Sequence, residues 1–264
     1  MWTRLLLLAL SICSAALIAS AVYAGPDEDK GLEIAVEADR RDTGFHDFRA
    51  ELTMLLRNRH GEESLRNMRT RVLEVDGDGD KTMIIFDQPR DVNGTALLTF
   101  SHKTDPDDQW LYLPALKRVK RISSRNKSGP FMGSEFAYED LASQEVEKYS
   151  YRFVKDDELD GQAMFLVERD PVDENSGYRR QLVWIDKAEY RPMKIEYYDR
   201  KDSLLKTLVF RGYEQFLDRY WRAREMFMEN HQTGKSTLLT WELYEFDVGI
   251  DDGDFTKNSL KRAK

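Results

Sequence analysis

The residues of this chain with the most potential for chemistry form a basic run between Pro114 and Ser134. Six cationic side chains fall in it with no carboxylate among them: Lys117, Arg118, Lys120, Arg121, Arg125 and Lys127. A Gly-Pro-Phe-Met-Gly turn follows at residues 129–133. Clustered cations of this kind suit anionic lipid headgroups or the acidic face of a partner protein. The alternative is a solvated hairpin, because charged runs usually face water.

No group of residues typical of an enzyme stands out. The sequence contains no nucleophile elbow, no phosphate-binding loop and no zinc-protease motif. Its four histidines lie far apart, and no two of them have the spacing of metal ligands. Asp76, Asp78 and Asp80 have the spacing of the first ligands of a calcium-binding loop, but Lys81 occupies the position where that loop needs glycine. We therefore expect a turn there, and we expect no catalytic residue, no metal site and no cofactor.

The first 24 residues are typical of a cleavable signal peptide. Arg4 precedes an apolar run, and small residues, Val22 and Ala24, occupy the two positions that a signal peptidase reads. We expect cleavage before Gly25 and a secreted mature protein. The alternative is a membrane anchor, because the apolar run approaches the length needed to span a bilayer.

Cysteine usage and net charge narrow the classes of protein further. The only cysteine is Cys13, and the bulky Ile12 before it argues against lipidation, so we expect Cys13 to leave with the signal peptide. The mature chain would then contain no disulfide. The chain carries 40 Lys and Arg against 48 Asp and Glu, a net charge of −8, which argues against general nucleic-acid binding.

Period-two alternation dominates the chain after one short N-terminal helix, for which Leu32 and Val36 are expected to lie on the apolar face. From Phe48 to Leu56, every second residue is apolar. About ten strands and few helices predict a highly curved antiparallel sheet or an open barrel. Residues 25–264 hold no linker or repeat, so we expect a single domain.

The basic run itself lies between a strand and an expected helix. The β-favouring stretch that contains Trp110 and Tyr112 is ended by Pro114, which cannot donate to a strand ladder. Ser134 is a plausible N-cap, and the acidic Glu135 after it suits the positive end of a helix dipole. We therefore expect a helix to begin after Ser134.

Two segments of this region resemble the signature of the bacterial outer-membrane lipoprotein-sorting protein family: residues 110–122 and 131–141. Shorter matches occur at residues 85–95, 197–199, 205–207 and 229–235, so the resemblance extends from about residue 32 to the end. It implies a mainly β, LolA/LolB-like fold, a half-open antiparallel β-barrel with short helices that form a lid over an apolar cavity. It also implies a periplasmic location and, as for many relatives, an inner-membrane exporter of the resistance-nodulation-division (RND) type as partner.

Large, adaptable side chains in the later strands are candidates for the cavity lining. They are Met164, Met193, Met226, Met228, Phe165, Tyr197, Phe210, Phe227, Trp221 and Trp241. Methionines and aromatics line cavities that accept varied apolar ligands. The alternative is that they simply fill a core.

The resemblance also suggests roles for the central motif. The expected mouth and lid residues are Trp110, Tyr112, Leu113, Phe131, Met132 and Phe136. The expected contacts to headgroups or to the exporter are Lys117, Arg118, Lys120 and Arg121. We expect a monomeric periplasmic carrier, without enzymatic activity, that binds lipid or lipoprotein acyl chains and moves them toward the outer membrane. The alternatives are a non-carrier accessory subunit that docks to an exporter and, less favoured, a secreted hydrolase.

Overall fold

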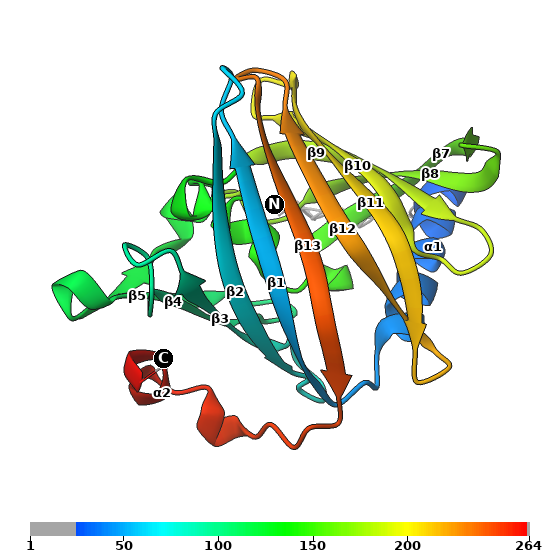
Figure 1. Cartoon of the computed structure of the whole chain (residues 1–264). Coiled ribbons are helices and arrows are strands. Elements are labelled where there is room, and N and C mark those ends of the chain that lie inside the picture. The colour runs from blue at the N-terminus through cyan, green and yellow to red at the C-terminus, as the bar shows by residue number, and fades with distance from the viewer. Residues whose placement is uncertain (1–24, 263–264) are drawn as a thin grey trace, which may run out of the picture.

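The computed structural model describes residues 25–262, and one curved antiparallel sheet dominates them (Figure 1). Its thirteen strands are ordered β6-β5-β4-β3-β2-β1-β13-β12-β11-β10-β9-β8-β7. The first meander comprises β1 (Asp47–Arg57), β2 (Glu63–Leu73), β3 (Lys81–Gln88), β4 (Ala96–Phe100), β5 (Asp108–Leu113) and β6 (Arg118–Ile122). The second comprises β7 (Tyr149–Leu159), β8 (Gln162–Pro171), β9 (Tyr178–Asp186), β10 (Pro192–Asp199), β11 (Leu204–Phe216), β12 (Tyr220–Asn230) and β13 (Lys235–Phe246).

Pairing of the first and last strands joins the two meanders. Leu52 of β1 lies opposite Met68 of β2 on one side and opposite Trp241 of β13 on the other. Ala50, Leu52 and Met54 are buried, whereas Arg49 and Glu51 between them are exposed, as the alternation predicts. The expected mainly β architecture, a half-open antiparallel sheet, is confirmed, and the sheet stays open because no pairing joins β6 to β7 in the part of the chain described.

Two central strands of the first meander, β3 and β4, are buried on both faces. Ile84 and Phe86 of β3 belong to the large inner cluster, whereas Met83 and Ile85 belong to a second cluster on the outer face. Phe255 and Leu260, from the C-terminal segment that includes helix α2 (Lys257–Arg262), cover that outer face. Burial on both sides explains why β3 is a continuous apolar run and shows no alternation.

The connection between β6 and β7 crosses the inner side of the sheet from one edge to the other. We call residues 123–148 the crossing segment. It runs behind β1 and β13 in the view of Figure 1. Phe131 and Phe136 in this segment are 0% and 1% exposed and join the inner cluster.

The helix predicted after Ser134 is not formed. Two short 3-10 turns, Tyr138–Leu141 and Val146–Lys148, take its place, and two more, Ser124–Asn126 and Phe131–Gly133, precede Ser134. Ala137 and Ala142, on either side of the turn at Tyr138–Leu141, have extended φ and ψ angles, which an α-helix excludes. Backbone groups of this segment instead bond to side chains of the sheet, so its irregular path needs no helical hydrogen bonds.

Helix α1 (Pro26–Asp42) exists as predicted, but its buried face is different. Gly31 and Ile34 are buried, whereas Leu32 and Val36, expected to face the core, are 45% and 48% exposed. A Cβ atom on Gly31 would lie 2.7 Å from the backbone nitrogen of Phe153 in β7. The helix thus packs backbone against backbone on β7, and this close approach selects the face that carries glycine.

No helix within residues 25–262 is long and apolar enough to cross a membrane. The predicted signal peptide, with Cys13, lies outside the described residues.

Replacement of Gly31 by alanine tests the docking of α1. In a free helix this change would stabilise by about 0.5–1 kcal/mol. Here we expect it to lower the free energy of unfolding by about 1–3 kcal/mol, because the added methyl group overlaps β7. Urea unfolding measures the effect, with Val36→Ala on the exposed face as a control expected to change stability by less than about 0.5 kcal/mol. A stabilised Gly31→Ala variant would contradict the docking.

Candidate functional site

A large cavity lies on the inner side of the second meander. Its volume is about 1620 Å³, beyond the roughly 300–1,000 Å³ of a typical small-molecule site. One wall consists of inward-facing side chains of β8 to β13: Val167, Val183, Ile185, Ile195, Tyr197, Leu208, Phe210, Met226 and Trp241. These nine side chains form an apolar patch, whereas Arg169 of β8, Gln215 of β11 and Arg222 of β12 also line the cavity and make its remaining wall polar.

A buried ion pair fixes the crossing segment at one end of the cavity. Lys206 of β11 lies 2.6 Å from Asp140 of the crossing segment, and both side chains are only 4% exposed. Lys206 also donates to the carbonyl oxygen of Glu135 at 2.9 Å, and the Tyr178 hydroxyl donates to Asp140 at 2.8 Å. Burial and the charge of Asp140 hold the pKa of Tyr178 well above its usual range, so this hydroxyl keeps its proton.

Further hydrogen bonds tie the same segment to other strands. The backbone N–H of Glu135 donates to the Thr237 hydroxyl of β13 at 3.0 Å, and the Asn230 amide of β12 donates to the Glu135 carboxylate at 2.7 Å. Arg66 of β2 donates to the carbonyl of Met132 at 2.5 Å. The crossing segment is therefore held by both meanders and divides a filled half of the inner side from a hollow half.

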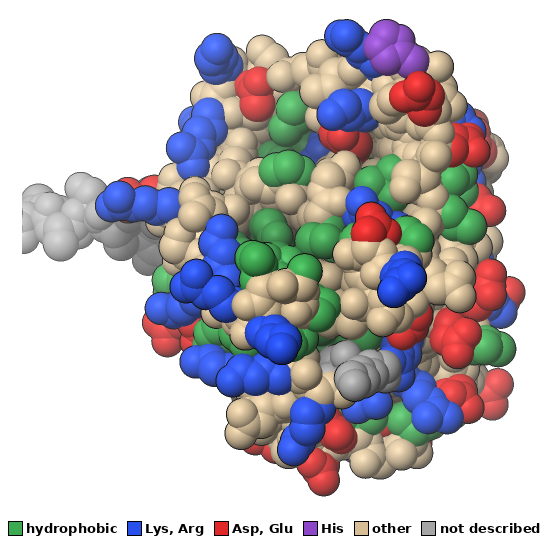
Figure 2. Space-filling view, turned by 60° about the vertical axis from the view of Figure 1, so that its left-hand side comes forward, with side chains coloured by type: hydrophobic (Ala, Val, Ile, Leu, Met, Phe, Trp, Pro, Cys, Tyr) green, Lys and Arg blue, Asp and Glu red, His purple; other side chains and the backbone are tan. Residues whose placement is uncertain are grey.

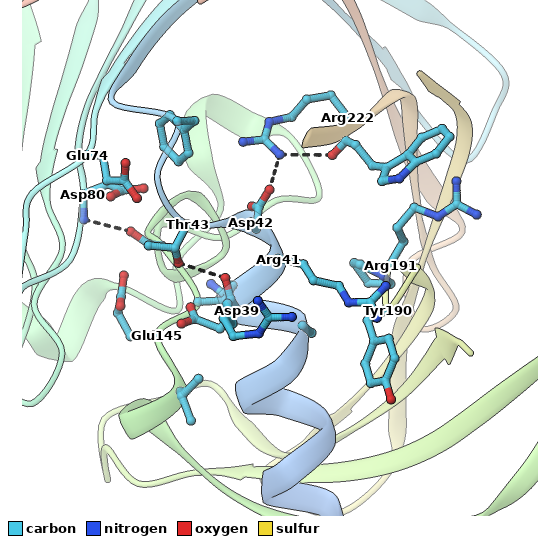
Figure 3. A pocket seen from close by; sticks show the side chains of 18 of the residues that line it. Asp39, Arg41, Asp42, Thr43, Glu74, Asp80, Glu145, Tyr190, Arg191 and Arg222 are labelled. Atoms are coloured by element: carbon cyan, nitrogen blue, oxygen red, sulfur yellow. Dashed lines mark hydrogen bonds and ion pairs between the residues drawn. The ribbon is translucent and has the colours of Figure 1, made fainter. Parts of the chain in front are cut away.

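The entrance to the cavity is charged on two sides. Figure 3 shows the C-terminal end of α1, with Asp39 and Asp42, between an acidic group and a basic group. The acidic group is Glu74, Asp80 and Glu145; the basic group is Arg41, Arg191 and Arg222. These residues come from α1, β12, the β2–β3 and β9–β10 loops and the crossing segment, so only the fold assembles them.

The arginines of the basic group are already paired. Arg191 donates to Asp186 at 2.7 Å and stacks at 4.4 Å over the ring of Trp221. Arg222 donates to Asp42. Arg41 donates to Glu37 at 2.8 Å and to the carbonyl oxygen of Ala188. Their charges are thus largely neutralised by the protein itself.

Among residues 25–262, the acidic group has no ion pair, although Glu74 accepts hydrogen bonds from the backbone N–H groups of Gly44 and His46 at 2.6 and 2.9 Å. Burial, together with the neighbouring charges of Glu145, Glu74 and Asp42, raises the pKa of Asp80 to about 7. Burial likewise raises the pKa of Glu145 and of Asp39. The carboxyl groups on this side of the cavity therefore bind protons more readily than exposed carboxyl groups do.

The predicted mouth and lid residues lie elsewhere. Trp110 and Tyr112 belong to the outer cluster beneath α2. Phe131 and Phe136 lie in the inner cluster, with Leu113 and Met132 packed against it. None of the six lines the large cavity.

The predicted basic contacts lie on an edge of the sheet. Arg118, Lys120 and Arg121 are exposed on the edge strand β6, and Lys117 forms the preceding turn with a φ angle of 47°. Figure 2, which brings the β5–β6 side forward, shows Lys and Arg side chains gathered near exposed hydrophobic side chains. Leu116, at the tip of the hairpin, is 63% exposed.

Half of the methionine and aromatic residues that we predicted to line a cavity do so. Tyr197, Phe210, Trp221, Met226 and Trp241 line it, whereas the other five residues of that prediction do not. Alternation along β12 places Met226 inward, but Trp221, five residues earlier, has the opposite parity and lines the cavity from the end of the strand. The charged entrance was missed, because its members are scattered along the sequence.

The likeness to known proteins covers most of the chain. A family model described as "-like: Uncharacterized protein" matches residues 78–262. No curated protein matches.

Three solved structures share the fold over nearly their whole length. An outer membrane lipoprotein-sorting protein domain from Vibrio parahaemolyticus is 61% identical, with a TM-score of 0.88, over 89% of this chain and 100% of that one. A DUF1329 family protein from Desulfovibrio piger is 32% identical, with a TM-score of 0.85, over 89% and 99%. A LolA superfamily protein from Nitrosomonas europaea is 20% identical, with a TM-score of 0.71, over 87% and 98%, which shows the fold alone.

Replacement of Asp80 by asparagine tests the acidic entrance through stability. The folded-state pKa of about 7 lies above the unfolded value of about 3.9. Between these values the folded protein holds a proton that the unfolded chain has lost, so stability falls as the pH rises from 4 to 8. Asparagine cannot ionise, and we expect Asp80→Asn to exceed the wild type by about 1–3 kcal/mol at pH 8 but to match it near pH 4.

Urea unfolding at both pH values measures this difference. Asp105→Asn, at an exposed position outside the cavity, is the matched control and should change stability by less than about 0.5 kcal/mol. A difference for Asp80→Asn that is the same at pH 4 and pH 8 would contradict the raised pKa.

Proposed function

This chain belongs to the same family as the DUF1329 protein and the outer membrane lipoprotein-sorting protein domain, and we propose that it is a periplasmic carrier of lipid or lipoprotein acyl chains. The cargo would occupy the large cavity and travel toward the outer membrane. An inner-membrane exporter of the RND type would supply or receive it. The protein would act by binding alone, without a chemical step.

The observation that carries this proposal is the apolar wall of the cavity. An acyl chain gains about 0.8 kcal/mol for each methylene group removed from water. Tyr197, Phe210 and Met226 offer such a chain a surface within an open sheet. Met226 is unbranched and flexible, so the wall can adapt to chains of different shape.

Release of the cargo would involve the crossing segment. We assign the lid role to Phe131, Met132 and Phe136, which lie in the filled half of the inner side beside the cavity. Movement of this segment would change the volume available to the cargo. Trp110 and Tyr112 we assign to the packing of α2, because they lie on the outer face.

A bulky substitution in the cavity wall tests the binding site. We expect Met226→Trp to lower the affinity for a fluorescent fatty acid by at least about tenfold, because the indole would occupy the space of the chain. Leu65→Trp, which adds the same ring at a position 55% exposed on β2, is the matched control. Equal affinity of the two variants would place the binding site outside the cavity. Absence of binding by the wild type would favour the accessory-subunit alternative.

Charge reversal on the edge strand tests the delivery surface. We expect replacement of Lys117, Arg118, Lys120 and Arg121 by glutamate to slow transfer of a fluorescent phospholipid from the carrier to anionic vesicles several-fold. Each lost cation removes about 1 kcal/mol of attraction to an anionic surface, and salt should weaken the effect.

The control reverses four exposed cations that lie away from β6: Arg59, Lys155, Lys201 and Lys235. It makes the same change in net charge and should leave the transfer rate near that of the wild type. Equal slowing in both variants would remove the β6 cations from the mechanism and leave only net charge as the cause.

A further inference from the structure

A row of polar side chains crosses the inner face of the second meander beside the apolar patch of the cavity. Strand pairing places one residue of each strand from β7 to β11 in this polar row: Tyr151, Arg169, Gln181, Tyr197 and Lys206. Because alternate residues of a strand face the same side, the next inward row lies two residues along each strand. That row is apolar and contains Val167, Val183, Ile195 and Leu208. An amphiphile can therefore lie with its chain on apolar side chains and its headgroup at the polar row.

Arg169 is the member of the polar row whose charge has no counter-ion. It lines the cavity, and within residues 25–262 it forms no ion pair with a carboxylate. Its Nε atom donates to the side-chain oxygen of Gln181 at 2.8 Å, and its Nη2 atom donates to that of Gln144 at 3.3 Å. A guanidinium group carries five N–H donors, so most of those of Arg169 stay available. Asp140, which lines the cavity from the crossing segment, is already paired with Lys206.

This lack of a counter-ion distinguishes Arg169 from most arginines that line the same cavity. Four of them pair with carboxylates: Arg40, Arg41, Arg191 and Arg222. Arg219 has backbone carbonyl oxygens as acceptors, but its side chain is exposed at the end of α1. Arg169 is partly buried on the sheet, where water neutralises a charge less well. An anion bound in the cavity would supply the missing counter-ion.

Two tyrosine hydroxyl groups of the polar row are also available. Tyr151 and Tyr197 line the cavity, and in the described part of the chain neither hydroxyl forms a hydrogen bond with another protein group. Burial raises the pKa of both tyrosines, so each hydroxyl keeps its proton and can donate it to an anion in a hydrogen bond. Tyr151 is the cross-strand neighbour of Arg169, so the two can donate to the same headgroup.

We propose that the cavity selects amphiphiles with an anionic headgroup, a carboxylate or a phosphate, which Arg169 holds through its free N–H groups and to which the tyrosine hydroxyls donate. The chain would lie over the apolar row that begins at Val167. This inference rests on the proposed carrier function and specifies the chemical class of its cargo. The planar fork of a guanidinium group matches both anions, and such charge-assisted hydrogen bonds are stronger than those to a neutral hydroxyl.

Binding of three compounds with the same saturated chain tests the proposal: hexadecanoic acid, hexadecyl phosphate and hexadecanol. Each is titrated into the protein at neutral pH, below its aggregation limit, and isothermal titration calorimetry gives the dissociation constant. We expect both anions to bind at least about tenfold more tightly than the alcohol. The tighter of the two anions identifies the preferred headgroup as a carboxylate or a phosphate.

Variants of the polar row locate the headgroup. Arg169→Gln should lose at least about tenfold in affinity for the anions and keep its affinity for the alcohol, which also shows that the variant is folded. Arg219→Gln, the same change at the exposed cavity arginine, is the matched control and should bind all three compounds like the wild type. Tyr151→Phe alters no charge and removes one donor, so it should lose about threefold in affinity for the anions alone.

The outcomes separate the two proposals. Alcohol binding as tight as anion binding, or equal losses of anion affinity in Arg169→Gln and Arg219→Gln, overturns the headgroup inference and leaves the carrier function standing. An unchanged anion affinity of Tyr151→Phe removes that hydroxyl from the site. Failure of all three compounds to bind the wild type overturns the carrier function, and the headgroup inference with it.

Discussion

The buried ion pair between Lys206 and Asp140 is the interaction on which the inner side of this protein depends. An open sheet of thirteen strands leaves β6 and β7 at opposite edges, so the chain between them must cross the interior. The crossing brings backbone polar groups into an apolar space, where each needs a partner. Lys206 supplies one to Glu135 and neutralises Asp140. Loss of either charge would leave the other buried and alone, at a cost of about 3–5 kcal/mol.

This anchoring determines where the protein is filled and where it is hollow. Phe131 and Phe136 pack in the inner cluster, Phe131 against Phe86 of β3, while the strands of the second meander keep an apolar patch that faces a cavity bounded by α1 and by residues 140–146. A carrier needs both parts. The filled half supplies stability, and the hollow half supplies surface that an acyl chain can cover. Charged side chains around the C-terminal end of α1 line the other end of the same cavity.

The sequence predicted the regular parts of this structure well and the irregular parts poorly. Alternation along β1 and the lipoprotein-sorting motif indicated the mainly β, LolA-like fold. The part of the crossing segment after Ser134 was wrongly predicted to be a helix, because an N-cap residue followed by acidic residues also suits the extended and 3-10 turns that Ala137 to Ala142 form. The buried face of α1 depends on backbone contact at Gly31, which side-chain patterns do not register. The acidic entrance joins residues from α1 to Glu145, and no local signal connects them.

Native mass spectrometry of the mature protein, purified from Gly25 onward without detergent, tests the central claim most directly. Organic extraction and analysis of the co-purifying molecules would follow. The account predicts one amphiphile bound per protein, released on extraction and identifiable by its mass. A clean mass of the unliganded chain, together with no uptake of a fluorescent fatty acid, would contradict the carrier function.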